Sequence, residues 1–167
     1  MDRDARRKRD NRNTMILAIV LGCIPAGVCV LGIAAAVAIP AFVSYTKRAK
    51  VAEAETNLQQ LTRFVESRCQ AGRGLPGAAG PVPATPTDRR QTPSFASDPV
   101  FAELGFAPAG GVYYAYSIVP RGDGSVALRA QGDLDGDGTL STIEKGCYPT
   151  ATGCDCSGPA TRTNELE

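Results

Sequence analysis

Apolar and polar residues follow two successive patterns along the first part of the chain. Residues 15–39 contain no charged side chain and are mostly apolar. As a helix rising 1.5 Å per residue they would extend about 37 Å, which exceeds the roughly 30 Å hydrocarbon core of a bilayer. The pattern predicts a transmembrane helix over residues 15–40, because the apolar region of a cleaved secretory signal is shorter.

The second pattern is a helical stripe that begins at residue 51, where apolar residues recur every three or four positions. The stripe consists of Val51, Ala54, Leu58, Leu61, Val65 and Cys69. This spacing places all of them on one face of a helix. It predicts an amphipathic stem over residues 41–71 that ends at Gly72. The stripe is short for a free coiled coil, so we expect it to pack on a sheet, with Cys69 facing that sheet.

The composition changes at residue 72. Residues 72–99 are rich in proline, glycine, alanine and threonine, which predicts a long surface loop without helix or strand. Residues 100–167 form the predicted β-rich head, which begins with a helical turn. Alternating residues at 112–119, a turn and a return run at 125–131 predict a hairpin. The predicted fold class is α+β, with the long N-terminal helix packed on a small antiparallel β-sheet.

Charge is unevenly distributed, although the net charge is only +1. Six arginine and lysine residues lie within residues 1–14 and precede the apolar run, as is typical of a cytoplasmic tail. We therefore expect a single-pass inner-membrane protein with a cytoplasmic N-terminus and an exported head. The small net charge predicts no nucleic-acid partner. Histidine is absent and no nucleophile–base pair can be argued, so we expect no enzyme, no catalytic residues and no small-molecule substrate.

Residues 31–42 read Leu-Gly-Ile-Ala-Ala-Ala-Val-Ala-Ile-Pro-Ala-Phe. Together with the stem, this run closely resembles the N-terminal helix of type IV pilins and type II secretion pseudopilins. Gly32 and Pro40 fall where the family places a glycine and a helix-bending proline, and Phe42 supplies the following aromatic residue. The resemblance implies a structural subunit of a type IV pilus or a secretion-type filament, at the cell surface if it is processed. In such filaments the helix packs against other pilin-like subunits or further copies of the chain.

The start of the apolar run departs from the family pattern. Alignment on Pro40 places the first mature residue at Ile19, preceded by Ala18 instead of glycine. Cys23 then occupies the position at which family members carry a glutamate. Residues 20–23, Val-Leu-Gly-Cys, resemble a bacterial lipobox in which Gly22 precedes a lipidated Cys23. The alternative is therefore an anchored or lipidated exported domain that does not polymerise and binds calcium or a protein partner.

Residues 133–144 fit the twelve-residue calcium-loop template. Aspartates stand at its first, third and fifth positions, and Gly138 stands at the sixth. The predicted ligands are Asp133, Asp135, Asp137, Thr139, Ser141 and Glu144. Closely spaced carboxylates repel one another unless a hard cation lies among them, which favours calcium as the cofactor. The competing interpretation is an ordinary Asp-Gly turn between strands, because the flanking helices of an EF-hand are missing.

The cysteines beyond the apolar run are Cys69, Cys147, Cys154 and Cys156. An even number of cysteines in an exported domain predicts two disulfides, whereas a four-thiolate zinc site is disfavoured by the exported location. Cys154 and Cys156 are too close in sequence to bond each other. One of them is expected to join Cys147 and the other Cys69, but the sequence leaves the choice open. The resemblance to pilins likewise implies a disulfide-bounded C-terminal region.

Overall fold

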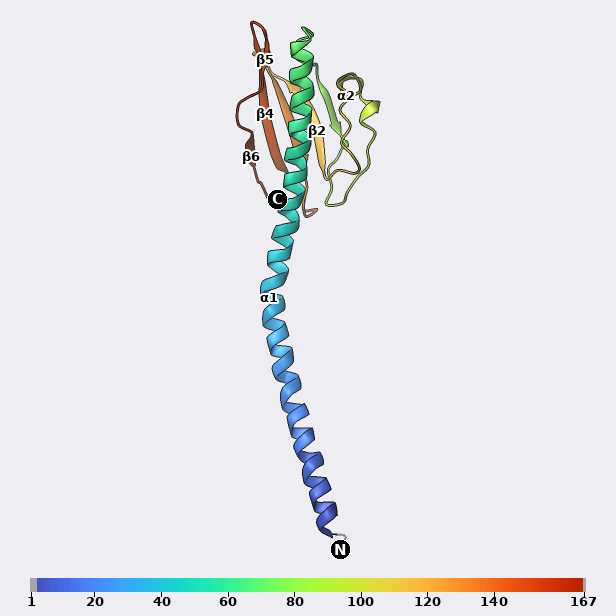
Figure 1. Cartoon of the computed structure of the whole chain (residues 1–167). Helices are drawn as coiled ribbons and strands as arrows, with labels where there is room; N and C mark the ends of the chain where they lie inside the picture. Colours follow the sequence, from blue (N-terminus) through green and yellow to red (C-terminus); the bar gives the residue numbers. More distant parts are fainter. Residues whose placement is uncertain (1–2, 167) are drawn as a thin grey trace. The chain divides into compact units, whose positions relative to one another are not determined.

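The computed structural model describes residues 3–166, with side chains described for residues 14–16 and from residue 32 onward. The helix α1 (Arg3–Gln70) contributes to two compact units, Met1–Ser44 and Tyr45–Glu167 (Figure 1). It ends where the sequence predicted. Gly72 adopts a left-handed φ of 73°, and its N–H donates to the Cys69 carbonyl at 2.9 Å. Such a terminal glycine satisfies a carbonyl that the helix itself leaves free.

In the first unit, residues 32–44 are helical and exposed to solvent. They include the three residues matched to the pilin helix, Gly32, Pro40 and Phe42. Within the described residues, no helical segment is both long enough and apolar enough to cross a membrane. Residues 17–31, which make up most of the predicted span, lie outside the described side chains. The same holds for the processing candidates Ala18, Ile19, Gly22 and Cys23, and for the basic residues of the tail.

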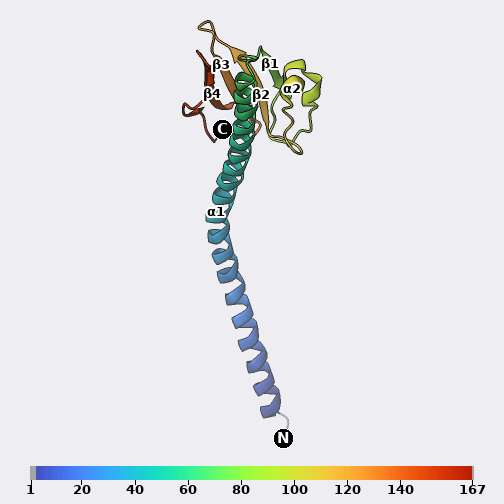
Figure 2. The same ribbon diagram turned by 45° about the horizontal axis from the view of Figure 1, so that its top comes forward.

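The second unit contains a six-stranded antiparallel sheet in the order β1-β2-β3-β4-β5, with β6 also paired to β4 (Figures 1 and 2). Its strands are β1 (Ala79–Val82), β2 (Tyr114–Pro120), β3 (Val126–Gly132), β4 (Ser141–Thr150), β5 (Gly153–Asp155) and β6 (Thr161–Thr163). The predicted hairpin is confirmed by the pairing of β2 with β3. A 3₁₀ helix, η1 (Phe95–Ser97), and a short helix, α2 (Pro99–Leu104), precede β2.

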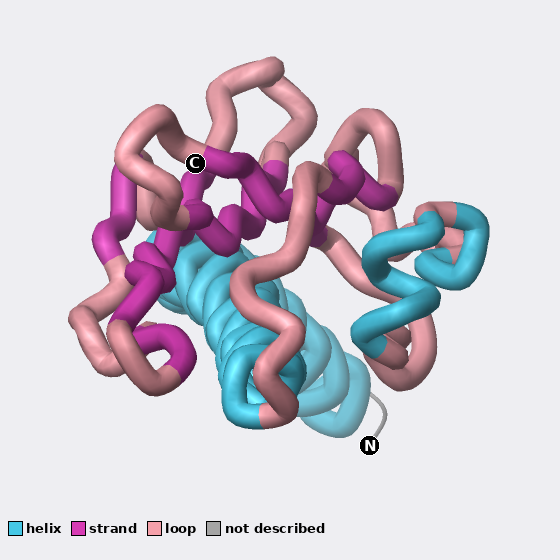
Figure 3. Tube along the Cα trace, turned by 90° about the horizontal axis from the view of Figure 1, so that it is seen from above, coloured by secondary structure: helices cyan, strands magenta, loops and turns pink. Residues whose placement is uncertain are grey.

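The α1 segment of this unit lies across one face of the sheet (Figures 1 and 3). All six stripe positions are buried, with exposed fractions between 0 and 5%. They share one core with the inward-facing residues of the strands, among them Tyr116, Leu128 and Ile143. The predicted α+β class and the packing of the stem on the sheet are therefore confirmed. Because one helix covers one antiparallel sheet, the architecture is pilin-like.

The prediction that residues 72–99 contain neither helix nor strand is wrong, because β1 and η1 lie within them. β1 is an edge strand that pairs with β2, a position at which proline is tolerated. Its Gly80 fits against β2, where any side chain would collide with the Tyr116 carbonyl. The Gly80 N–H also donates to the Asp98 carboxylate at 2.8 Å, and that carboxylate caps α2 through Val100 and Phe101.

Candidate functional site

The predicted calcium loop joins β3 to β4 and is fastened to the first turns of α1 in the second unit. Leu134 buries its side chain in the core. The Lys50 ammonium donates to the carbonyls of Leu134 and Asp88, each at 2.9 Å. The two ends of the loop are fixed by paired strands, since Gly132 lies opposite Ser141. The loop is thus held at both ends and at Leu134, its second residue.

The structure brings together the three aspartates of the loop. Their carboxylate oxygens lie within 4.8 Å of one another, with Asp135 and Asp137 exposed and Asp133 half-buried. The Asp133 carboxylate accepts hydrogen bonds from the backbone of Gly136 at 2.7 Å and Gly138 at 3.1 Å. Both glycines have left-handed φ values, 82° and 88°, which favour glycine. This exposed aspartate triad could bind a metal ion.

A lysine already neutralises part of the triad. The Lys47 ammonium lies 2.9 Å from the Asp135 carboxylate, and its hydrogen bond lowers the pKa of Asp135. Asp135 therefore stays ionised at neutral pH. A cation that binds all three aspartates must compete with the Lys47 ammonium for this carboxylate. Lys47 and Asp135 are 88 residues apart in sequence, so no local pattern could have revealed this pair.

The structure places two of the predicted ligands away from the triad. Ser141 is fully buried, and its hydroxyl pairs with the Tyr114 hydroxyl at 3.0 Å and donates to the Glu165 carbonyl at 3.2 Å. Glu144 accepts hydrogen bonds from Arg129 at 2.8 Å and from Arg121. Burial raises the pKa of Glu144, but these two arginines more than offset that effect and lower it overall.

The reason for this separation is that both residues lie in β4. Alternate residues of a strand point to opposite faces, so Ser141 and Glu144 cannot turn toward one site. Three residues of extended chain also carry Glu144 about 10 Å along the strand. A calcium loop needs the chain to curl at these positions. Thr139, in contrast, stays in the turn, where its N–H donates to the Asp137 carboxylate at 2.7 Å.

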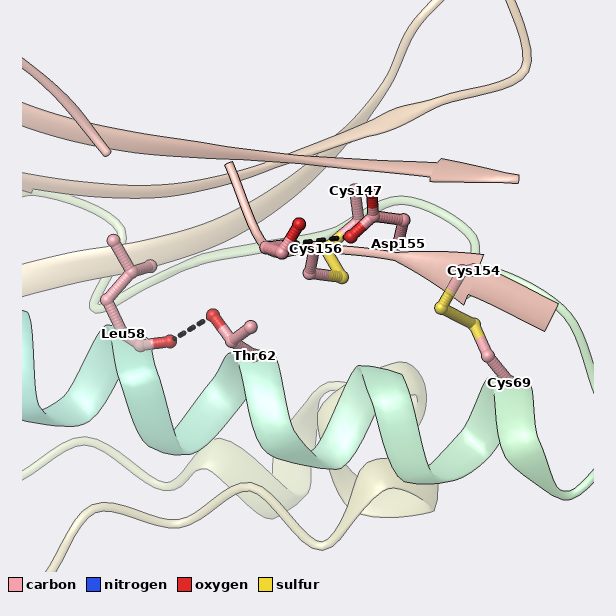
Figure 4. The surroundings of a disulfide bond; sticks show 8 residues. Leu58, Thr62, Cys69, Cys147, Cys154, Asp155 and Cys156 are labelled. Atoms are coloured by element: carbon pink, nitrogen blue, oxygen red, sulfur yellow. Dashed lines mark hydrogen bonds between the residues drawn. A yellow bond between two sulfur atoms is a disulfide. The ribbon is translucent and has the colours of Figure 1, made fainter. Parts of the chain in front are cut away.

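The two disulfides join Cys69 to Cys154 and Cys147 to Cys156 (Figure 4). The prediction that each member of the Cys-x-Cys pair takes a different partner is confirmed. Strand register explains which partner each one takes. In the β4–β5 ladder Tyr148 lies opposite Asp155, so the next pair outward is Cys147 and Cys156.

Cys154 lies two residues before Cys156 and therefore shares its side of the chain. That side faces α1, where Cys69 occupies the last turn of the helix (Figure 4). The sequence placed Cys69 correctly on the buried stripe but could not supply the β4–β5 register. Two disulfides indicate an extracytoplasmic domain, because such bonds persist in oxidising compartments.

A comparison of this chain with known protein families, curated proteins and solved structures found no match. The pilin-like likeness rests on the architecture and on the residues quoted above.

Proposed function

We propose that this chain is a membrane-anchored, pilin-like subunit of a type IV pilus or a type II secretion-type filament. The supporting observation is the contrast between two parts of α1. From Val51 onward the apolar stripe is covered by the sheet. Before it, the large apolar side chains that the structure describes are exposed, with Ile33 at 69%, Val37 at 70% and Phe42 at 67%.

Exposed apolar side chains at this density need a covering surface. Burial of one large aliphatic or aromatic side chain is worth about 1.5–3 kcal/mol. Ile33, Val37, Ile39, Phe42 and Val43 together would therefore gain on the order of 10 kcal/mol from lipid or from neighbouring helices. In the proposed mechanism the helix first lies in the inner membrane. It then packs laterally against equivalent helices, with the disulfide-bonded heads outward.

The aspartate triad supports a structural calcium ion in the head. Carboxylate oxygens are the ligands that calcium prefers, and Asp133, Asp135 and Asp137 would hold it. The bound ion would tie the β3–β4 loop in one conformation. Calorimetric titration of the full chain in detergent, with its disulfides intact, tests this part. Lack of binding at millimolar calcium would remove the ion from the proposal and leave the filament function standing.

The mature N-terminus tests the filament function itself. Mass spectrometry of the protein from its native membrane should find a methylated residue near Ile19 if the chain is processed like a pilin. An intact Met1 would contradict processing. A diacylglyceryl group on Cys23 would instead support the second candidate, an anchored exported domain that does not polymerise. That candidate is favoured by one observation, namely that Cys23 stands where filament subunits carry glutamate.

A further inference from the structure

The two disulfides differ in how deeply their cysteines are buried, although their tail cysteines, Cys154 and Cys156, are separated by a single residue. Cys147 and Cys156 are buried, with 0% and 1% of their surface exposed. In the other bond Cys69 is 2% exposed, whereas Cys154 is only partly buried at the edge of the core. Of the four bonded cysteines, Cys154 is thus the one that is not buried, and it is the position most open to an external thiolate.

We propose that Cys154 is a thiol-exchange site, at which an external thiolate opens the Cys69–Cys154 bond while Cys147–Cys156 stays closed. The thiolate sulfur attacks Sγ of Cys154 and forms a mixed disulfide. The Cys69 sulfur departs as a thiolate and takes a proton from solvent. A second thiolate then attacks the mixed disulfide and releases the Cys154 thiolate. The protein disulfide gains two electrons, and the two external thiols are oxidised to one disulfide.

The surroundings limit what this exchange releases. Cys69 is the penultimate residue of α1, so opening the bond frees the end of the helix from the tail. The tail itself remains attached through the second disulfide and through the pairing of β6 with β4. Arg162 adds an ion pair to Glu55 on α1, with its Nε 2.7 Å from the carboxylate. The exchange thus uncouples the top of the helix without unfolding the head.

Peptide mapping reads the two bonds separately. The full chain in detergent is treated with reduced glutathione for increasing times, blocked with N-ethylmaleimide, denatured and digested with trypsin. Cleavage at arginine and lysine places Cys69 in peptide 69–73 and the other three head cysteines in peptide 146–162. Cys23 and Cys29 fall in peptide 13–47, so they do not confuse the result. The intact protein yields peptides 69–73 and 146–162 joined as one species.

The expected result is loss of that joined species, with one maleimide on peptide 69–73. Peptide 146–162 should keep its internal disulfide and carry either one maleimide or one glutathione, which fragmentation places on Cys154. The Cys69–Cys154 bond should open at least about tenfold faster than the other, since a local opening that costs about 1.4 kcal/mol slows exchange by that factor.

Protein denatured before glutathione is added serves as the control, in which both bonds should open at similar rates. Three results in the native chain would overturn the proposal. They are equal opening rates for the two bonds, earlier opening of Cys147–Cys156, and resistance of both bonds to glutathione. Attachment of glutathione to Cys69 would refute the assignment of Cys154 as the attacked residue.

Discussion

The two disulfides offer a test of how the head is stabilised, because they close loops of very different length. Cys69–Cys154 spans 85 residues, whereas Cys147–Cys156 spans 9. The perturbation is removal of each bond alone, in the double variants C69A/C154A and C147A/C156A. Each variant deletes two sulfur atoms and leaves the other bond in place.

The chain-entropy model predicts unequal losses at 25 °C. Loss of the 85-residue loop should lower the free energy of unfolding by about 4.6 kcal/mol, and loss of the 9-residue loop by about 2.6 kcal/mol. The two bonds overlap in sequence, but Cys147–Cys156 shortens the loop closed by Cys69–Cys154 by only a few residues. Each estimate therefore holds in the presence of the other bond. Cavity formation predicts the opposite order, because Cys147 and Cys156 are more deeply buried than Cys154.

Urea unfolding of the unit Tyr45–Glu167, followed by circular dichroism, measures both losses. The dependence of the unfolding free energy on urea should rise in both variants, because the unfolded chain becomes more extended. The expected order is a larger loss for C69A/C154A, by about 2 kcal/mol. If C147A/C156A is destabilised as much or more, the loop-entropy reasoning is refuted and packing of the buried sulfur atoms accounts for the stability.

Three further predictions concern single side chains. Leu61→Ala should lower the free energy of unfolding by about 3 kcal/mol in the same assay, since Leu61 is 0% exposed. Gln60→Ala, on the exposed side of the helix, is the matched control and should change it by less than about 0.5 kcal/mol. Three backbone hydrogen bonds outweigh burial and hold the pKa of Asp98 below its ordinary value of 3.8. The folded state then binds the Asp98 proton less readily than the unfolded chain does. The ionised Asp98 carboxylate therefore contributes fully to the free energy of unfolding above pH 3.8, and this contribution is lost as the pH falls through the folded pKa. The melting temperature should consequently drop more steeply in acid for the native protein than for Asp98→Asn. An identical acid slope in the two proteins would contradict this role. Finally, Asp135→Asn should weaken calcium binding by about tenfold in calorimetry, because one of three carboxylates is lost. Asp155→Asn, which alters an exposed carboxylate outside the triad, should leave the affinity unchanged.

The sequence was most informative where local spacing decides the structure. The stem stripe was predictable because six apolar residues at helical spacing can be buried together only on a helix. The hairpin of β2 and β3 was predictable because alternation and turn residues both lie within a short stretch. The number of possible disulfide pairings was reduced because Cys154 and Cys156 are too close in sequence to bond each other. None of these inferences needed a partner from a distant part of the chain.

The sequence was least informative where a distant partner decides. β1 exists because β2 offers it an edge, and no pattern in residues 72–99 could show that. Glu144 fitted a calcium template by spacing, but pairing of β3 with β4 places it opposite Arg129. The calcium-loop template requires the chain to curl as far as its twelfth position, but β4 begins at Ser141 and keeps the chain extended through Glu144. The three aspartates do form a cluster, because they lie in the turn that precedes β4.

The position of the aspartate loop gives it a structural consequence that spacing alone did not reveal. Along α1 the apolar side chains pass from exposed at Val43, 47%, to buried at Val51, 5%. Lys47 and Lys50, which lie between them, both bond to the loop. The loop therefore contacts α1 at the turns where its apolar side chains become buried. A cation bound by the triad would compete with Lys47 for Asp135 and so weaken the bond between the loop and this part of α1. Lys50 donates to a backbone carbonyl instead of a carboxylate, so its bond to the loop would remain.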